Sequence, residues 1–342
     1  MKGGALLFVG FEGQRLGAGE RRILRRLQPG GVVLLPRNIG EEPELHALVA
    51  ELRALCPETI LALDAEGGRV DRLRNIVGPA PAAADLARHP PRLARRAGRW
   101  IGAALRAFDF DLDFAPVVDL DHGRQNNALD RRCLGKTPLQ VVTKAKRFIE
   151  GLEAAGVGAC VKHWPGLGAA GEDTHLEPSR IDLSRADLER DAEPFRRLAA
   201  RAGAVMVGHA IYPALDPEQR PATLSPALVA ETREAVLPFN GVFFSDDLEM
   251  GALASFGDLA ERGEAALRAG CDGLLFCRQL EATPEIAARL ARPRLARRRE
   301  EAERRLAALG RRLAQLRRVA PEPPPLAAIR RRLAAVTAAA RR

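Results

Sequence analysis

Residues 159–168 read Ala159-Cys160-Val161-Lys162-His163-Trp164-Pro165-Gly166-Leu167-Gly168, and Asp173-Thr174-His175 follows shortly afterwards. The first four residues predict a short buried strand, and the basic pair Lys162-His163 falls at its end. A glycine-rich loop that carries charged side chains is poorly suited to a core and well suited to a site. The stretch therefore predicts a strand whose carboxyl end carries chemistry.

The same alternation of short apolar runs and longer amphipathic stretches extends along the chain. The predicted strands are Ala5–Phe11, Gly31–Leu35, Ile60–Asp64, Leu112–Val118, Ala159–Lys162, Ala204–Gly208, Val242–Ser245 and Gly273–Cys277. The predicted helices are Gly19–Leu27, Glu42–Leu55, Arg92–Phe108, Thr137–Ala155, Arg185–Ala202, Ser225–Val236 and Leu259–Ala269. Strands that alternate with helices indicate a parallel sheet, and eight strands are the number that closes a (β/α)8 TIM barrel.

Polar residues at the carboxyl ends of these strands favour the closed barrel, because those ends share one face in a barrel. They are Asp64, Asp119, Lys162, His163, His209 and Asp246. An open doubly wound sheet, the alternative fold, unites only the strands at its switch point, and no Gly-x-Gly-x-x-Gly opens the first helix. We predict an α/β chain with a catalytic barrel over residues 1–280. A basic helical extension over residues 281–342 packs on the barrel or trails from it.

The formal net charge of +9 is concentrated in the predicted extension. Residues 281–342 carry 17 arginines against 6 acidic residues, whereas the preceding residues carry 36 basic and 38 acidic ones. The predicted barrel therefore lacks the electrostatic footprint of a nucleic-acid-binding protein. The extension is interpreted as a solvated helical segment rich in arginine and alanine, and contact with an anionic surface is the alternative.

Cysteine spacing and the N-terminal segment set the expected compartment. Five scattered cysteines without a Cys-x-x-Cys pair argue against a disulfide framework or a zinc site. The run Ala5–Phe11 is followed at once by Glu12 and Arg15, which favours a first strand over a signal peptide. No apolar run is long enough to cross a bilayer. We expect a cytoplasmic monomer with no metal, cofactor, nucleic acid or membrane partner.

Two segments carry residues suited to nucleophilic and acid–base chemistry. Asp246 directly follows the strand Val242–Ser245, so its carboxylate either attacks an anomeric carbon or, like Asp247, caps the following helix. Asp173 either orients His175 and raises its basicity, or forms an Asx turn beside a solvated histidine. From the residues alone, both alternatives stay open for each segment.

Five motifs are decisive when they are taken together. They are Asp64-Ala65-Glu66-Gly67-Gly68-Arg69-Val70-Asp71-Arg72, Phe114-Ala115-Pro116-Val117-Val118-Asp119, Lys162-His163-Trp164-Pro165-Gly166, Asp173-Thr174-His175 and Ser245-Asp246-Asp247-Leu248-Glu249-Met250. Over residues 30 to 280 the sequence resembles family 3 glycoside hydrolases, in particular single-domain bacterial β-N-acetylhexosaminidases. It departs from the family pattern at Leu167, where relatives usually carry His, and at Ala65, where Gln is common.

The resemblance implies a role for each matched residue. Asp246 is the expected nucleophile, and Asp173 with His175 is the expected acid/base dyad. The expected sugar-binding residues are Asp64, Arg72, Lys162 and His163, together with Arg132, which stands before Cys133-Leu134-Gly135 and aligns with an arginine that contacts the sugar in the family. Asp247 keeps the capping role, and His209 is either a ligand at the barrel mouth or a structural histidine.

The activity implied by the resemblance is that of a retaining exo-β-N-acetylglucosaminidase. Such an enzyme releases N-acetylglucosamine (GlcNAc) from cytosolic muropeptides with 1,6-anhydro-N-acetylmuramic acid during cell-wall recycling. A β-glucosidase or a β-glycoside phosphorylase of the same family is the alternative. A Schiff-base lyase that uses Lys162, or a sugar-binding barrel without catalysis, belongs to a different class and leaves Asp246 and the Asp-x-His dyad without roles.

Overall fold

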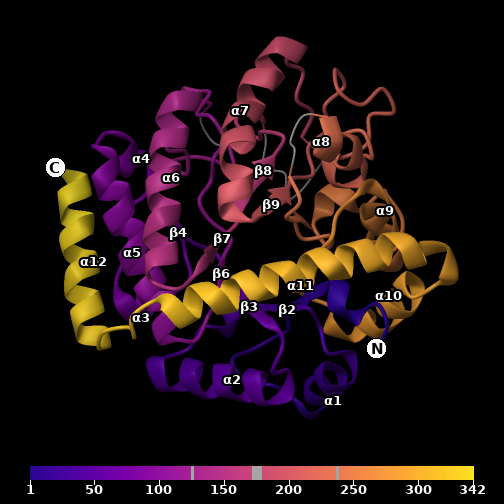
Figure 1. Cartoon of the computed structure of the whole chain (residues 1–342), viewed down its shortest axis with the longest axis horizontal. Coiled ribbons are helices and arrows are strands. Elements are labelled where there is room, and N and C mark those ends of the chain that lie inside the picture. The colour runs from indigo at the N-terminus through magenta and orange to yellow at the C-terminus, as the bar shows by residue number, and fades with distance from the viewer. Residues whose placement is uncertain (125–126, 172–178, 236–238) are drawn as a thin grey trace.

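The computed structural model of the chain describes residues 1–124, 127–171, 179–235 and 239–342. Short strands alternate with helices through most of the chain (Figure 1). The strands are β1 Leu7–Val9, β2 Gly31–Val33, β3 Ile60–Leu63, β4 Ala65–Gly67, β5 Val70–Asp71, β6 Leu112–Asp113, β7 Gly158–Ala159, β8 Val161–Trp164, β9 Ala204–Val207, β10 Val242–Ser245 and β11 Leu274–Phe276. The predicted α/β class is confirmed.

Twelve α-helices lie within the described residues. They are α1 Ala18–Leu27, α2 Glu42–Leu55, α3 Arg74–Val77, α4 Ala83–Ala87, α5 Pro91–Ala107, α6 Pro138–Ala154, α7 Arg185–Ala202, α8 Ala230–Ala235, α9 Leu259–Ala269, α10 Thr283–Leu290, α11 Ala296–Val319 and α12 Leu326–Arg341. The helix predicted from Ser225 is shorter than expected, because a 3-10 turn and further turns occupy residues 222–229. Regular helix begins only at Ala230.

Helix ends follow local capping chemistry. The Ser184 hydroxyl accepts a hydrogen bond from the Asp187 backbone N–H at the start of α7. Asp258 forms a capping box with Glu261 at the start of α9. Both contacts satisfy backbone donors that the first helical turn leaves without partners. The capping role expected for Asp247 is wrong, because α9 begins after Asp258 and Asp247 binds backbone groups of a turn.

The strand pairing forms two parallel sheets and one small hairpin. The larger sheet has the order β11-β1-β2-β3-β6-β7, the smaller has the order β10-β9-β8, and β4 pairs antiparallel with β5. Isolated parallel bridges join Val117 to Lys162 and Phe244 to Gly273, which connects the two sheets at both sides. The parallel arrangement is confirmed, while the closed eight-stranded ring stays a prediction.

The core brings aromatic rings together from strands that are far apart in the sequence. Phe244 of β10 contacts Phe8 of β1 with ring centroids 4.7 Å apart, and contacts Phe114 with centroids 5.6 Å apart. Both contacts are edge-to-face, the geometry that aromatic quadrupoles favour. All three side chains are almost fully buried. One apolar centre therefore underlies both parallel sheets.

The C-terminal helices pack on the strand-bearing part of the chain. The long helix α11 crosses the molecule, and α12 lies beside α5 (Figure 1). Fully buried Asp272, just before β11, accepts hydrogen bonds from Arg298 at 2.7 Å and from Arg305 at 3.1 Å, both on α11, and from Arg233 at 2.7 Å. Part of the basic charge of residues 281–342 is thus matched by acids of the preceding segment. The boundary at residue 280 stays a prediction.

All five cysteines are buried and free. Across the described ranges, no helix combines the length and the apolar character needed to pass through a lipid bilayer.

Candidate active site

A buried cluster of charged side chains lies where β3 and β8 end. The Lys162 ammonium, on β8, is 2.6 Å from Asp64 Oδ1 and 2.7 Å from Glu66 Oε1. Arg72 donates to Asp64 Oδ2 at 3.3 Å. Burial acts to raise the pKa of Asp64, but Lys162 and Arg72 together hold that pKa below its ordinary value. Burial acts to lower the pKa of Lys162, and the two carboxylates raise it overall. The cluster is therefore fully ionised at neutral pH.

Glu66 links this cluster to Arg132. Its carboxylate accepts two hydrogen bonds from one guanidinium, from Arg132 Nε at 2.8 Å and from Nη2 at 2.7 Å. Arg132 and Lys162 outweigh burial and keep the pKa of Glu66 well below its usual range. Sequence reasoning quoted Glu66 in a motif but assigned it no role. Its importance depends on partners 66 and 96 residues further along the chain.

The hairpin that carries Glu66 needs its glycines. Gly67 has φ +90° and Gly68 has φ +62°, a region that side chains rarely adopt. A Cβ atom on Gly67 would also lie 2.2 Å from the Pro81 carbonyl oxygen. The Gly-Gly pair makes a sharp turn, and Arg72, just after the return strand β5, lies beside Asp64.

His163 is held by a fully buried carboxylate. Asp119 Oδ2 lies 2.8 Å from His163 Nδ1, and Asp119 also accepts hydrogen bonds from the backbone N–H groups of His163 and Leu167. A carboxylate can only accept here, so Nδ1 carries the proton and Nε2 is the acceptor of the neutral ring. The loop Pro165–Gly168 is thereby tied to the histidine.

Asp246 directly follows β10, as the sequence predicts. Its backbone N–H donates to the Val207 carbonyl oxygen at 2.9 Å, and its Oδ1 accepts from the Asp247 N–H at 2.8 Å. Burial acts to raise the pKa of Asp246, but His209 and His163 lower it overall. An ionised carboxylate with a low pKa is the state that a nucleophile requires.

A cavity of about 310 Å³ is lined by most of these residues. Its lining includes six residues singled out from the sequence, namely Asp64, Arg72, Arg132, Lys162, His163 and Asp246. Their catalytic and binding roles stay predictions. Asp173 and His175 lie outside the described residues. Leu167, one of the departures from the family pattern, also lines the cavity.

Three polar residues of this cavity were not singled out from the sequence as site residues. Arg37 follows β2, Arg278 follows β11, and Asp247 follows the proposed nucleophile. The strand-end pattern that located Asp64 and Asp246 applies equally to both arginines and could have found them. Burial and the neighbouring Glu249 raise the pKa of Asp247 to about 7.

Two other histidines, His209 and His122, are not among the residues that line this cavity. His209 is buried, with Nδ1 2.7 Å from Thr223 Oγ1 and Nε2 2.9 Å from the Asp247 carbonyl oxygen. His122 Nε2 lies 2.9 Å from Asp191 Oδ2, and this hydrogen bond raises the pKa of His122. Within the described ranges, no group of three or more His, Cys, Asp or Glu side chains could hold a metal ion.

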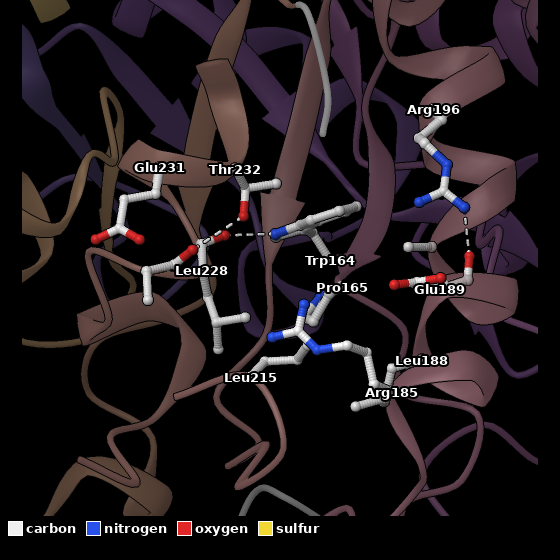
Figure 2. Close-up of a pocket in the computed structure, with 12 residues that line it drawn as sticks. Trp164, Pro165, Arg185, Leu188, Glu189, Arg196, Leu215, Leu228, Glu231 and Thr232 are labelled. Carbon is white, nitrogen blue, oxygen red and sulfur yellow. Dashed lines mark hydrogen bonds between the residues drawn. The ribbon is translucent and has the colours of Figure 1, made fainter. Parts of the chain in front are cut away.

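A second cavity of about 290 Å³ is lined by Trp164 and Pro165 among others (Figure 2). Its walls come from α7 and from residues 215–232, and they include apolar Leu188 and Leu228 as well as charged Arg185 and Glu231. The Trp164 indole N–H donates to the Leu228 carbonyl oxygen at 2.6 Å. None of the candidate site residues of the described chain lines this cavity, so the catalytic candidate is the cavity at Asp246.

The chain is similar in sequence to a known family and to named proteins. A family model described as the glycosyl hydrolase family 3 N-terminal domain matches residues 1–312. The chain is 40% identical over 290 residues to a beta-hexosaminidase of Pseudomonas aeruginosa, covering 84% of this chain and 86% of that one. It is 41% identical over 280 residues to a beta-hexosaminidase of Tolumonas auensis, covering 79% and 82%.

Solved structures agree with the sequence matches. NagZ from Neisseria gonorrhoeae, in complex with N-trifluoroacetyl-D-glucosamine, is 30% identical, with a TM-score of 0.78 over 98% of this chain and 99% of that one. A family 3 β-N-acetylglucosaminidase from Paenibacillus is 30% identical with a TM-score of 0.86, covering 98% and 68%. The fold and these matches define a glycoside hydrolase. Within that class, the chain belongs to glycosyl hydrolase family 3.

Proposed function

We propose that this chain is a retaining exo-β-N-acetylglucosaminidase. The observation that carries the proposal is the cavity in which ionised Asp246 faces the same space as Lys162, Arg72, Arg132 and His163. Relatives named beta-hexosaminidase and a structural neighbour crystallised with an N-acylated glucosamine support the choice of sugar.

The proposed mechanism uses two displacements at the anomeric carbon. Asp246 attacks C1 while the bond from C1 to the leaving oxygen breaks, and the protonated His175 imidazole gives its proton to that oxygen. The imidazole then takes a proton from water, whose oxygen attacks C1 and releases Asp246. Asp173 orients the histidine by accepting a hydrogen bond. The dyad is assigned from sequence resemblance.

The sugar-binding roles follow from donor and acceptor chemistry. Asp64 offers carboxylate oxygens to sugar hydroxyls, and Lys162, Arg72 and Arg132 offer donors, while the neutral ring of His163 offers Nε2 as an acceptor. The ion pairs with Asp64 and Glu66 keep the cationic side chains in place before a sugar arrives. Such preorganisation lowers the cost of binding.

We also infer that the parallel strands close into a (β/α)8 barrel of eight strands, in which β7 and β8, separated only by Cys160, count as one. In support, the Val118 N–H donates to the Lys162 carbonyl oxygen at 2.9 Å, and the Ser245 N–H donates to the Gly273 carbonyl oxygen at 2.9 Å. These contacts lie at the two seams between the sheets. The shared aromatic centre of Phe8 and Phe244 spans the same two sheets.

The proposed natural substrate is a cytosolic muropeptide of cell-wall recycling in which GlcNAc is linked to 1,6-anhydro-N-acetylmuramic acid. This part of the proposal, together with a cytoplasmic location and a monomeric state, rests on the family resemblance. A β-glucosidase or a phosphorylase of the family is the second candidate. A Schiff-base lyase is disfavoured, because a nucleophilic lysine needs a lowered pKa and the carboxylates around Lys162 raise it.

The nucleophile is tested with a mechanism-based trap. A 5-fluoro-GlcNAc reagent should leave a covalent adduct on the peptide that contains Asp246. An adduct on another peptide, or inversion at the anomeric carbon, would contradict the assignment. Turnover of aryl β-GlcNAc against aryl β-glucoside, in water and in phosphate, separates the hydrolase from the second candidate.

The acid/base dyad is tested by leaving-group dependence. His175→Ala should lose about 100- to 10,000-fold on a natural disaccharide, and far less on an aryl glycoside with an acidic phenol. Asp173→Asn should show the same pattern with smaller losses, because the ring stays in place. Equal losses on both substrates would mean that His175 only binds sugar.

A further inference from the structure

Three cationic residues that line the cavity already have carboxylate partners within the protein. Lys162 pairs with Asp64 and Glu66, Arg72 pairs with Asp64, and Arg132 pairs with Glu66. These side chains still have N–H donors for neutral sugar hydroxyls. Most of their positive charge is balanced by the carboxylates of Asp64 and Glu66. A charged group on a substrate would have to be met elsewhere in the cavity.

Two further arginines line the same cavity on its β2 and β11 side. Arg37 follows β2 and Arg278 follows β11, and these strands flank β1 in the larger sheet. Arg37 Nε donates to the Phe11 carbonyl oxygen at 3.0 Å, and its Nη2 donates to the carbonyl of Cys277, the residue before Arg278. The two guanidinium-bearing residues are therefore held next to each other. Neutral carbonyl partners fix Arg37 without cancelling its charge.

Two acidic residues close to Arg278 in the fold, Asp247 and Glu249, form no ion pair with Arg37 or Arg278 within the described part of the chain. Asp247 accepts hydrogen bonds from the backbone N–H groups of Glu249 and Cys277, and Glu249 accepts from those of Arg278 and Gln279. Both carboxylates thus bind backbone N–H groups of the loops that follow β10 and β11. Among the described residues, the Arg278 guanidinium has no hydrogen-bond or ion-pair partner.

Glu12 is the one acid in the described chain that pairs with this side of the cavity. Its Oε1 lies 3.0 Å from Arg37 Nε, and the Glu12 side chain is 69% exposed. An ion pair with one member so exposed contributes little to stability, because water and salt screen it. A better-placed anion can therefore displace it.

We propose that Arg37 and Arg278, together called the arginine rim, bind a carboxylate carried by the substrate outside the sugar ring that reacts at Asp246. Guanidinium groups bind carboxylates with two parallel hydrogen bonds. The rim and Asp246 line one cavity, so one molecule can reach both. The inference rests on the proposed glycosidase function, and it makes the rim a determinant of specificity for acidic glycosides.

The test compares two substrates that differ only in this charge. One is GlcNAc linked β-1,4 to 1,6-anhydro-N-acetylmuramic acid with a free lactyl carboxylate, and the other is its neutral methyl ester. Arg278→Gln should reduce the preference for the acid over the ester in kcat/KM by about 10-fold, mostly through KM. Arg278→Lys should keep most of the preference. Arg304→Gln, an exposed arginine on α11, controls for net charge and should leave both rates unchanged.

Salt gives an independent measurement. The preference of the wild-type enzyme for the acid should shrink between about 0.05 M and about 0.5 M salt, because exposed charges are screened. In Arg278→Gln the preference should change much less. Equal losses on acid and ester in Arg278→Gln, or an unchanged preference, would overturn the arginine rim while leaving the glycosidase intact. If the wild-type enzyme turns over neither substrate nor aryl β-GlcNAc, the proposed function fails, and this inference fails with it.

Discussion

Glu66→Gln should damage both stability and activity, although Glu66 is absent from the residues that the family resemblance places on the sugar. The substitution keeps the size of the side chain and removes its charge. Wild-type Glu66 accepts two hydrogen bonds from Arg132 and lies 2.7 Å from the Lys162 ammonium, and its side chain is only 4% exposed. The Gln side-chain amide would offer Arg132 and Lys162 one acceptor oxygen in place of two, and its NH2 group would add a donor beside these cations.

The expected loss follows from the charges that remain. The wild-type cluster sets two carboxylates, Asp64 and Glu66, against Lys162, Arg72 and Arg132, whereas the variant retains only Asp64. Removing one partner of a buried ion pair commonly costs roughly 3–5 kcal/mol of the free energy of unfolding. With an unfolding entropy of about 2.1 cal/mol/K per residue for a chain of this length, the melting temperature should fall by about 4–7 °C.

The pH dependence separates this explanation from general loss of packing. The pKa of Glu66 in the folded state lies below its value in the unfolded chain. Its stabilisation is therefore complete above the unfolded pKa of about 4.3 and is lost as pH falls towards the folded pKa. Melting curves of the two proteins should differ fully at pH 7 and converge below about pH 4. A difference that does not vary with pH would refute the reasoning.

Activity provides the second measurement. If Glu66 positions Arg132 and Lys162 against the sugar, kcat/KM on aryl β-GlcNAc should fall by about 100-fold, the usual effect of small misplacements at a site. Glu301→Gln on α11 is the matched control, because Glu301 pairs with Arg297, whose side chain is 95% exposed. That variant should lose less than about 1 kcal/mol and keep full activity. Similar losses in both variants would contradict the assignment.

Three further predictions concern other buried carboxylates. The pKa of Asp247 is about 7, so folded Asp247 holds its proton more tightly than the unfolded chain. Its contribution to stability therefore decreases as pH rises from about 4 to about 7, and Asp247→Asn should flatten that slope in melting curves. Asp119→Asn places an amide donor against N–H groups of His163 and Leu167 and should lower kcat/KM at least about 10-fold; unchanged kinetics would argue against a positioning role. Asp272→Asn should lower the free energy of unfolding by roughly 3–5 kcal/mol, as measured by denaturant unfolding. The reason is that Arg233, Arg298 and Arg305 lose their shared carboxylate. The kcat of the folded protein should stay unchanged.

Local pattern was enough to find most elements of the fold. The predicted strand Val242–Ser245 and the helices Glu42–Leu55, Arg185–Ala202 and Leu259–Ala269 match the structure residue for residue. Burial repeats and capping residues are properties of neighbours in the chain, so a sequence carries them directly. The predicted helix starts at Ser225, before the observed start at Ala230, because a turn of similar composition precedes the helix.

The sequence by itself determined the α/β class, the strand-end positions of Asp64, Lys162, His163 and Asp246, and the family to which the motifs belong. Parallel strands align their carboxyl ends, so position along the chain predicts proximity in space. Only the tertiary structure decided which charges pair. Glu66 meets Arg132, Asp119 orients His163, and Asp272 gathers arginines from α11. Each pairing depends on a distance of about 3 Å between segments far apart in the chain, and that distance is set by packing, which has no local signature in the sequence.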